Sequence, residues 1–162
     1  MRVLAIDPAL RKTGFAVLEA TAPNTSPAVL TYGTHVNKPS LRQSLCFVEI
    51  RTRVSELIEE FNPEVCAIES VIYVQSYKTA IILGAARGAA VTAAAAAGLE
   101  IREYAPRRVK QAVVGKGAAD KSQVAFMIRA LLGLTETPEP DAADALAIGV
   151  AHIQSNGGGD LV

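Results

Sequence analysis

The sequence has 162 residues, of which 50% are hydrophobic and 5% aromatic, and its 16 basic residues are balanced by 16 acidic ones. This length fits one compact domain with a sizeable core. The zero net charge argues against a protein that binds nucleic acid over its whole surface. The Ala-rich uncharged stretch at residues 88–99 is too short and too rich in Ala and Gly to span a bilayer. The first residues, MRVLAIDP, lack the layout of a secretory signal. We therefore expect a cytoplasmic protein without a membrane partner.

The first part of the chain predicts three consecutive strands. RVLAID is apolar at both parities until Asp7, which is typical of a strand covered on both faces. Pro8 and Gly14 bracket a turn, and a second polar turn follows the next apolar segment. Strands that follow one another so closely favour an antiparallel meander. The three strands are expected at residues 2–7, 14–19 and 28–36.

The rest of the chain alternates predicted helices with predicted strands. Apolar residues between Ser40 and Phe61 recur at helical spacing, and Asn62-Pro63 ends that helix. The other expected elements are a strand at 65–69, a loop at 70–77, an Ala-rich helix at 78–97, a strand at 100–104, and helices near 107–113, 121–133 and 141–153. This order predicts one mixed α/β domain over residues 1–154, followed by a flexible tail, SNGGGDLV, at 155–162.

Two carboxylates, Asp7 and Glu69, each end an otherwise apolar strand. A carboxylate in that setting is partly desolvated and needs a cation, strong hydrogen bonds or a proton. For either residue alone, a helix cap or an ion pair explains the pattern equally well. Two such residues on separate buried strands favour a ligand site, because open sheets place their sites at strand ends.

Asp141 and Asp144 form a second acidic pair, three residues apart on one face of the last predicted helix. Acidic residues at a helix start also complement the helix dipole, and that explanation suffices for one of the two. His152 lies eight residues beyond Asp144. We expect it to be a surface or capping histidine of the last turn and leave it out of the site.

Four carboxylates that converge suit a hard cation such as Mg²⁺, with Mn²⁺ as a substitute, because both prefer oxygen ligands. Carboxylate bridges can hold two such ions about 4 Å apart, which supports in-line attack of water on a phosphodiester. Cys46 and Cys66 lie in apolar segments and are expected to be small buried residues rather than ligands or a disulfide.

The segment from Arg102 to Lys121 concentrates positive charge. Such a run is usually just a solvent-exposed face of the protein. By itself it is compatible with a nucleic-acid interface but does not establish one. Its basic residues outnumber the acidic Glu103 and Asp120; they are Arg102, Arg107, Arg108, Lys110, Lys116 and Lys121.

Several segments resemble the RuvC family of bacterial Holliday junction resolvases. The resemblance extends from Met1 to about Ile153, with the motifs in the family's order and spacing. The segments are IDPALRKTGFAV at 6–17, AIESV at 67–71, LGAARG at 83–88, YAPRRVKQAVVGKGAADKSQV at 104–124 and PDAADALAIGVAH at 140–152.

The resemblance implies an RNase H-like fold with a mixed five-stranded sheet flanked by helices. It also implies a homodimer that nicks four-way DNA junctions in pairs, with Mg²⁺, in recombination and repair. Two identical sites in a two-fold dimer suit a junction that presents two equivalent strands. The Ala-rich helix could pack either against the second copy or simply on the sheet. Whether a branch-migration motor docks on the dimer stays open.

The same resemblance implies roles for individual residues. The metal ligands and catalytic residues are Asp7, Glu69, Asp141 and Asp144, with two ions expected in each site; whether Asp141 binds metal directly or through water stays open. Lys110 and Lys121 fall where the family places lysines against the DNA. The other expected DNA contacts are Ile72, Tyr73, Lys78, Arg108, Lys116 and Ser122.

The chain departs from the family pattern in two segments. Ala9 follows the Asp-Pro pair where the family usually has Gly, which restricts positive-φ conformations in that turn. Ile72 stands where an aromatic residue would stack on an unpaired base, with Tyr73 as the neighbouring candidate. Ile can wedge between bases instead. These departures bear on sequence preference at the cut and not on the phosphodiester chemistry.

Three other functions compete with junction cleavage. Asp7 followed by Thr13-Gly14 also resembles the first phosphate loop of actin-like ATPases and sugar kinases, but those proteins need two such domains. A relative that binds nucleic acid or a partner without cutting would have lost a carboxylate, and all four are present. A relative that processes structured RNA is the third alternative.

Overall fold

The computed structural model describes residues 1–22, 25–72, 74–155 and 159–162. Within them the predicted elements form in the predicted order, and most boundaries fall within a residue or two of expectation. The strands are β1 (Arg2–Asp7), β2 (Lys12–Glu19), β3 (Ala28–Val36), β4 (Val65–Glu69), β5 (Glu100–Tyr104) and β6 (Asp160–Leu161). The helices are α1 (Gln43–Phe61), α2 (Tyr77–Ala96), α3 (Pro106–Val114), α4 (Lys121–Leu132) and α5 (Pro140–Gln154).

The strands form a single mixed sheet in the order β3-β2-β1-β4-β5-β6. β1, β2 and β3 make the predicted antiparallel meander, whereas β4 and β5 run parallel to β1. The mixed α/β class is confirmed, but the expected number of five strands is wrong. A short sixth strand pairs antiparallel with β5, where Arg102 faces Leu161. Local pattern could not predict this strand, because two residues after a Gly-rich segment are too few to show alternation.

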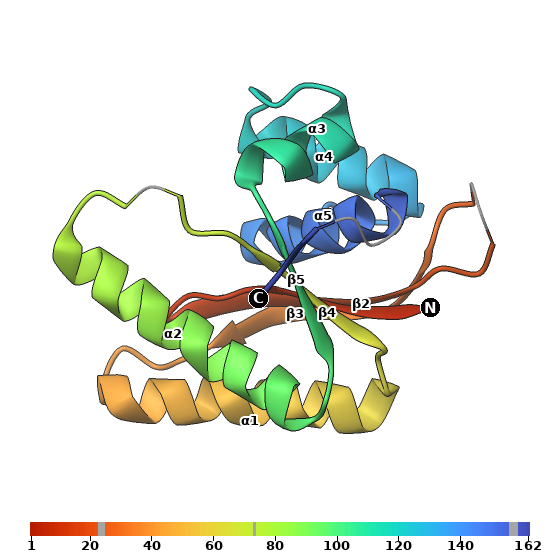
Figure 1. Cartoon of the computed structure of the whole chain (residues 1–162). Helices are drawn as coiled ribbons and strands as arrows, with labels where there is room; N and C mark the ends of the chain where they lie inside the picture. The colour runs from red at the N-terminus through yellow and green to blue at the C-terminus, as the bar shows by residue number, and fades with distance from the viewer. Residues whose placement is uncertain (23–24, 73, 156–158) are drawn as a thin grey trace.

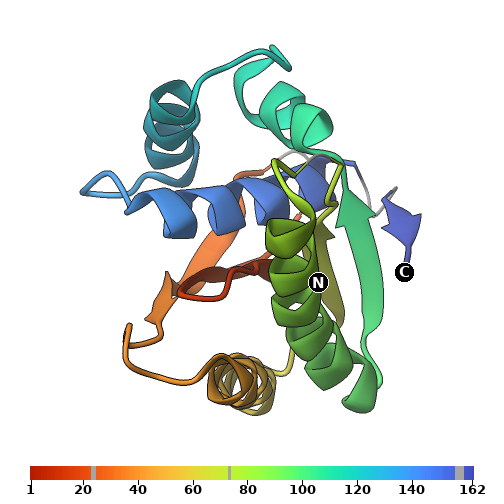
Figure 2. The ribbon, with the colours of Figure 1, turned by 90° about the vertical axis from the view of Figure 1, so that its left-hand side faces the viewer.

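Helices cover both faces of the sheet. Figure 1 shows α1 and α2 on one face and α5 on the other, with α3 and α4 beyond α5. Figure 2, turned by 90°, shows the same succession, with α5 crossing between the sheet and the two outer helices. Two apolar cores correspond to these layers, one between the sheet and α1–α2 and one around α5.

α5 is the most buried helix, and its position explains its unusual sequence pattern. The residues from Ala145 to His152 are all buried. A Cβ atom at Gly149 would lie 2.7 Å from Leu18 Cδ1, so the helix approaches β2 very closely there. Because α5 packs on the sheet with one side and on α3 and α4 with the other, its apolar residues need not form one narrow stripe.

α2 is long and apolar enough to cross a membrane by length and composition alone. In the structure it packs against α1, and its side chains at positions 86, 90, 93 and 94, all Ala, are buried in the core. Spacing of three and four residues places them on one face of the helix. α2 thus has the packing of a core helix on one side, while its other side stays exposed.

Candidate active site

Asp7 and Glu69 lie side by side at one edge of the sheet. β1 and β4 are parallel neighbours in which Ile6 pairs with Ile68, so the two following carboxylates leave adjacent strand ends in the same direction. Residues 3–6 of β1 and 65–68 of β4 are buried, and both carboxylates are only partly exposed. The prediction that each acid ends a buried strand is therefore confirmed, and the structure adds that the two strands are neighbours.

Gly14 brings the start of α5 to the same edge. It pairs with Asp7 across β1 and β2, and a Cβ atom on Gly14 would collide with the carbonyl oxygen of Asp141. Only a residue without a side chain permits this approach. The close contact fixes the first turn of α5 over the strand ends, which brings Asp141 and Asp144 to the two buried acids.

The carboxylates repel one another in this partly buried setting. Burial, and then the negative charges of Glu69, Asp144 and Asp141, raise the pKa of Asp7 to about 7, against an opposing effect of Lys121. Burial and Asp144 likewise raise the pKa of Glu69 to about 7, although Lys121 and Lys110 lower it. Two acids that are difficult to ionise near neutral pH form a site that a bound cation would stabilise.

Lys121 provides a positive charge within hydrogen-bonding distance. Its Nζ donates to Asp144 Oδ2 at 3.0 Å, and this contact, followed by the general attraction to Asp144, raises the pKa of the ammonium group. The Asp144 side chain is 26% exposed and that of Lys121 is 76% exposed. The ion pair therefore stands at the rim of the site, half in solvent.

Two cavities meet at Glu69. One, of about 390 Å³, also includes Asp7, Ile72, Leu83 and Arg107 in its lining. The other, of about 170 Å³, lies between α3, α4 and α5 and is lined in part by Lys110, Lys121 and Asp144. The acids and the two lysines therefore share one continuous region around Glu69.

The donor set suits a hard dication, although the acidic side chains do not converge on one point. In the described part of the chain, no three acidic, histidine or cysteine side chains stand close enough to hold a metal ion as they are placed. The site nevertheless offers only oxygen donors, two of them with raised pKa values. This chemistry fits Mg²⁺ or Mn²⁺ better than a softer metal.

The predicted DNA contacts differ in how close they lie to the acids. Ile72 is 70% exposed and lines the larger cavity. Lys110 and Lys121 line the smaller one. Lys78 and Lys116 are exposed, the first in the opening turn of α2 and the second just after α3. Tyr73 lies outside the described residues.

Two other expected contacts have partners within the protein. The Ser122 hydroxyl donates to Asp120 Oδ1 at 2.6 Å, beside the capping box that begins α4. The Arg108 guanidinium lies 5.5 Å from the centre of the Tyr104 ring, which is a cation–π distance. Arg107, which the sequence did not single out within the basic segment, lines the cavity with Asp7 instead. The periodicity of the sequence does not distinguish these adjacent arginines, because both are exposed residues in the first turn of α3.

His152 was expected to be a surface or capping residue, and that prediction is wrong. It is 2% exposed, and its Nδ1 lies 2.7 Å from the hydroxyl of buried Tyr104. Burial lowers its pKa. The error has a clear cause: the last turn of α5 is covered by β5 and the end of the chain, including Gly159, whose N–H donates to the Tyr104 hydroxyl.

Ala9 is accommodated without the glycine that the family usually has. The Thr13 hydroxyl donates to the Ala9 carbonyl at 2.8 Å and accepts from the Ala9 N–H at 3.3 Å. Ala9 does not adopt a positive φ. This departure therefore leaves the turn after Asp7 intact. Cys46 and Cys66 are buried and free, as expected.

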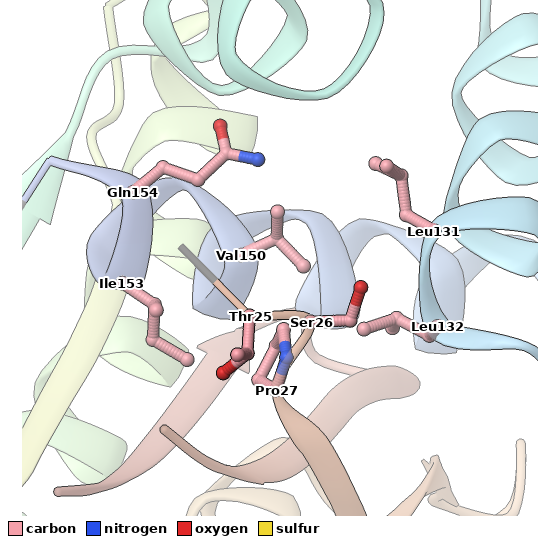
Figure 3. Close-up of a pocket in the computed structure, with 8 residues that line it drawn as sticks. All are labelled: Thr25, Ser26, Pro27, Leu131, Leu132, Val150, Ile153 and Gln154. Carbon is pink, nitrogen blue, oxygen red and sulfur yellow. The ribbon is translucent and has the colours of Figure 1, made fainter. Parts of the chain in front are cut away.

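A cavity of about 310 Å³ elsewhere on the molecule has a different character (Figure 3). It lies where the ends of α4 and α5 meet the turn between β2 and β3, with Leu131, Val150 and Ile153 among its apolar lining. Thr25, Ser26 and Gln154 are its polar members, and its described lining residues include no acid, base or cation. It offers no chemistry comparable to that of the carboxylate edge.

Comparisons with known proteins agree with this geometry. The family model for crossover junction endodeoxyribonuclease RuvC matches residues 3–152. RuvC of Akkermansia muciniphila is 56% identical over 155 residues, covering 96% of this chain and 92% of that protein. RuvC of Syntrophomonas wolfei is 41% identical, covering 96% and 90%.

Solved structures give the same result. Thermus thermophilus RuvC in complex with a Holliday junction substrate superposes with a TM-score of 0.91 at 33% identity, covering 100% of this chain and 99% of that one. A yeast mitochondrial Holliday junction resolvase, at 14% identity and a TM-score of 0.58, shares the fold. The chain therefore belongs to the RuvC family of crossover junction endodeoxyribonucleases and has its RNase H-like fold.

Proposed function

We propose that this protein resolves four-way DNA junctions in recombination and repair by paired, symmetric, metal-dependent hydrolysis of phosphodiester bonds. The observation that carries the proposal is the meeting of four carboxylates at one sheet edge in a chain of this family. Asp7 and Glu69 come from adjacent parallel strands, and Asp141 and Asp144 from the helix that crosses them. We place the nuclease domain at residues 1–154, with β6 from the tail added to its sheet, and we propose that the protein acts in the cytoplasm.

Each group has a defined task in this mechanism. The four carboxylates would hold Mg²⁺, with two ions in each site and Mn²⁺ as a substitute. Such ions supply a strong nucleophile at neutral pH and neutralise charge on the leaving oxygen. Lys110 and Lys121 would contact the phosphates that flank the cut, so binding should weaken steeply with salt. Ile72 stands at the mouth of the cavity beside Asp7, where it would wedge into the open crossover.

The exposed face of α2 supports a homodimer. Tyr77 is 91% exposed and Ile81 is 71% exposed, one helical turn apart. Further along the helix, a Cβ atom at Gly84 or Gly88 would meet nothing within 4 Å. An apolar helix face with small residues permits close approach by a second copy of the helix. α2 also contacts β5, and its buried alanines share a core with residues of the sheet, which supports the other role expected for this helix.

A substrate panel tests the proposed function. The wild-type protein is incubated with a synthetic four-way junction, a linear duplex of the same sequence and a structured RNA, each with and without Mg²⁺. We expect symmetric nicks in the junction alone, and only with the metal. Junction binding without nicking under Mg²⁺ or Mn²⁺ would instead identify a non-cutting module, and preferential cleavage of the RNA would identify a different substrate.

A further inference from the structure

The ammonium group of Lys121 occupies an unusual place for a DNA contact. It is hydrogen-bonded to Asp144 Oδ2 at 3.0 Å, across 23 positions in the sequence. Asp144 Oδ2 therefore already has a positively charged partner. A dication that used the same oxygen would have to displace the ammonium, because two positive centres this close repel each other strongly.

The influence of this lysine extends beyond its hydrogen-bonded partner. Lys121, Glu69 and Asp144 line the same cavity, and the charge of Lys121 acts on Asp7 as well. Lys110 lines this cavity too, but it has no carboxylate within ion-pair distance in the described residues. The charge of Lys110 also lowers the pKa of Glu69, but in the described residues Lys121 is the lysine that forms an ion pair with one of the acids.

The backbone of Lys121 is fixed while its side chain is free to move. Asp120 and Gln123 form a capping box around the first turn of α4, with the Gln123 N–H donating to Asp120 Oδ1 at 2.8 Å. The Lys121 side chain, in contrast, is largely in solvent. Moving the ammonium from Asp144 toward a nearby phosphate therefore requires rotation about side-chain bonds and no change in packing.

We infer that Lys121 is the internal counter-ion of the metal site: it pairs with Asp144 before the metal binds, competes with the metal for that oxygen, and is released toward the DNA when the metal enters. This inference rests on the proposed function. Because coupling between two binding events is reciprocal, a loaded metal site would present a freed lysine to the phosphate.

Mn²⁺ binding to the full-length protein without DNA tests the inference. The concentration of free Mn²⁺ is measured by electron paramagnetic resonance for wild type, Lys121→Gln, Lys121→Arg and Lys110→Gln, with circular dichroism melts to confirm that each variant folds. Lys110→Gln is the matched control, because it removes one positive charge from the same cavity without breaking an ion pair. We expect Lys121→Gln to bind Mn²⁺ roughly threefold tighter than wild type, as suits a half-exposed pair. Lys121→Arg should stay near wild type, and Lys110→Gln should gain clearly less than Lys121→Gln.

The possible failures are distinct. If Lys121→Gln binds Mn²⁺ no more tightly than wild type, while wild type binds Mn²⁺ and cleaves the junction normally, the inference is overturned. The proposed function is then unaffected. An equal gain in Lys121→Gln and Lys110→Gln also overturns it, since general electrostatics would then account for both. A folded wild-type protein that neither binds Mn²⁺ nor cuts a junction contradicts the inference and the proposed function together.

Discussion

At the scale of single residues, the site depends on carboxylates that the fold makes difficult to ionise. Burial is the largest cause of the raised pKa of both Asp7 and Glu69. Their sequence setting made this predictable, because each ends an apolar strand. His152 was not predictable in the same way, since its burial depends on β5 and on a chain end that packs over it.

The metal-free protein should lose stability as the pH rises through 7. The pKa of Asp7 is about 7 in the folded state against 3.8 as its ordinary value, so the folded state binds the proton more tightly. That contribution to the free energy of unfolding is present at low pH and is lost as pH rises. Between about pH 6.5 and about pH 8.5, the loss from this residue is about 1 kcal/mol. Chemical denaturation in EDTA of wild type and Asp7→Asn should show a smaller decline in the variant.

Asp160→Asn is the control, because Asp160 is exposed, lies on β6 at the edge of the sheet and lines neither cavity at the acids. The lower end of the pH range meets the ordinary pKa of 6.5 for His152, whose pKa is lowered by burial and whose effect on stability has the opposite sign. Because His152 is present in all three proteins, its effect cancels in the comparison. Parallel pH profiles for wild type and Asp7→Asn would show that Asp7 ionises freely in the folded protein.

Ile72 and Tyr73 bear on the choice of cutting site. Ile72 is exposed beside the carboxylates, where an apolar side chain can enter an opened base step. We expect Ile72→Ala or Tyr73→Ala to shift cleavage among junction positions, with rates at the preferred position falling roughly fivefold or more. Mapping nicks on mobile junctions at nucleotide resolution would show this. Unchanged cleavage patterns in both variants would mean that this loop does not read the crossover.

At the scale of elements, the site depends on the close packing of α5 on β2. The helix was predicted at 141–153 and forms at Pro140–Gln154. The period of its apolar residues could not predict which strand the helix crosses. It also could not predict how closely the helix approaches that strand, because the distance of approach depends on two glycines. Gly14 permits the close approach at the edge of the sheet that carries the acids, and Gly149 permits it farther along the helix.

Gly14→Ala should disable the site by moving the start of α5. The added methyl group would collide with the backbone of Asp141, so the first turn must shift together with Asp141 and Asp144. We expect the single-turnover rate of nicking to fall about a hundredfold. Gly149→Ala is the matched control, because its methyl group would strain the same contact against the flexible Leu18 side chain, away from the acids. It should lower the melting temperature and largely preserve cleavage. Equal loss of cleavage in both variants would contradict a positioning role for Gly14.

At the scale of the whole molecule, the helix layer that contains α2 has an uncovered face. α5 is enclosed between the sheet and the α3–α4 pair, whereas α2 is covered on one side only. Its Ala-rich sequence predicted a packing helix but could not assign its two faces, because small residues suit a sheet and a second helix alike. The order of elements and the strand-end acids were predictable from local pattern. The cavity position of Arg107 and the β5–β6 pairing required the assembled fold.

Ile81→Glu should separate the proposed dimer. A charge in the centre of the exposed α2 face would be desolvated on association, so the variant should sediment as a monomer. Val48→Glu, at an exposed apolar position of α1, is the control for an added charge and should remain dimeric. On a cruciform plasmid, the monomer should produce nicked circles in place of the linear product of paired cuts. Dimeric Ile81→Glu that still linearises the plasmid would place the interface elsewhere.

The role of the four carboxylates is tested most directly by nicking of one four-way junction under Mg²⁺. The nicking rate of wild type is compared with the rates of Asp7→Asn, Glu69→Gln, Asp141→Asn and Asp144→Asn. The affinity of each protein for the junction is measured separately, with Ca²⁺ in place of Mg²⁺. We predict that each variant cuts about a thousandfold more slowly or worse while it still binds the junction. Near wild-type nicking by Asp7→Asn or Glu69→Gln would contradict the assignment of the active site to this edge of the sheet.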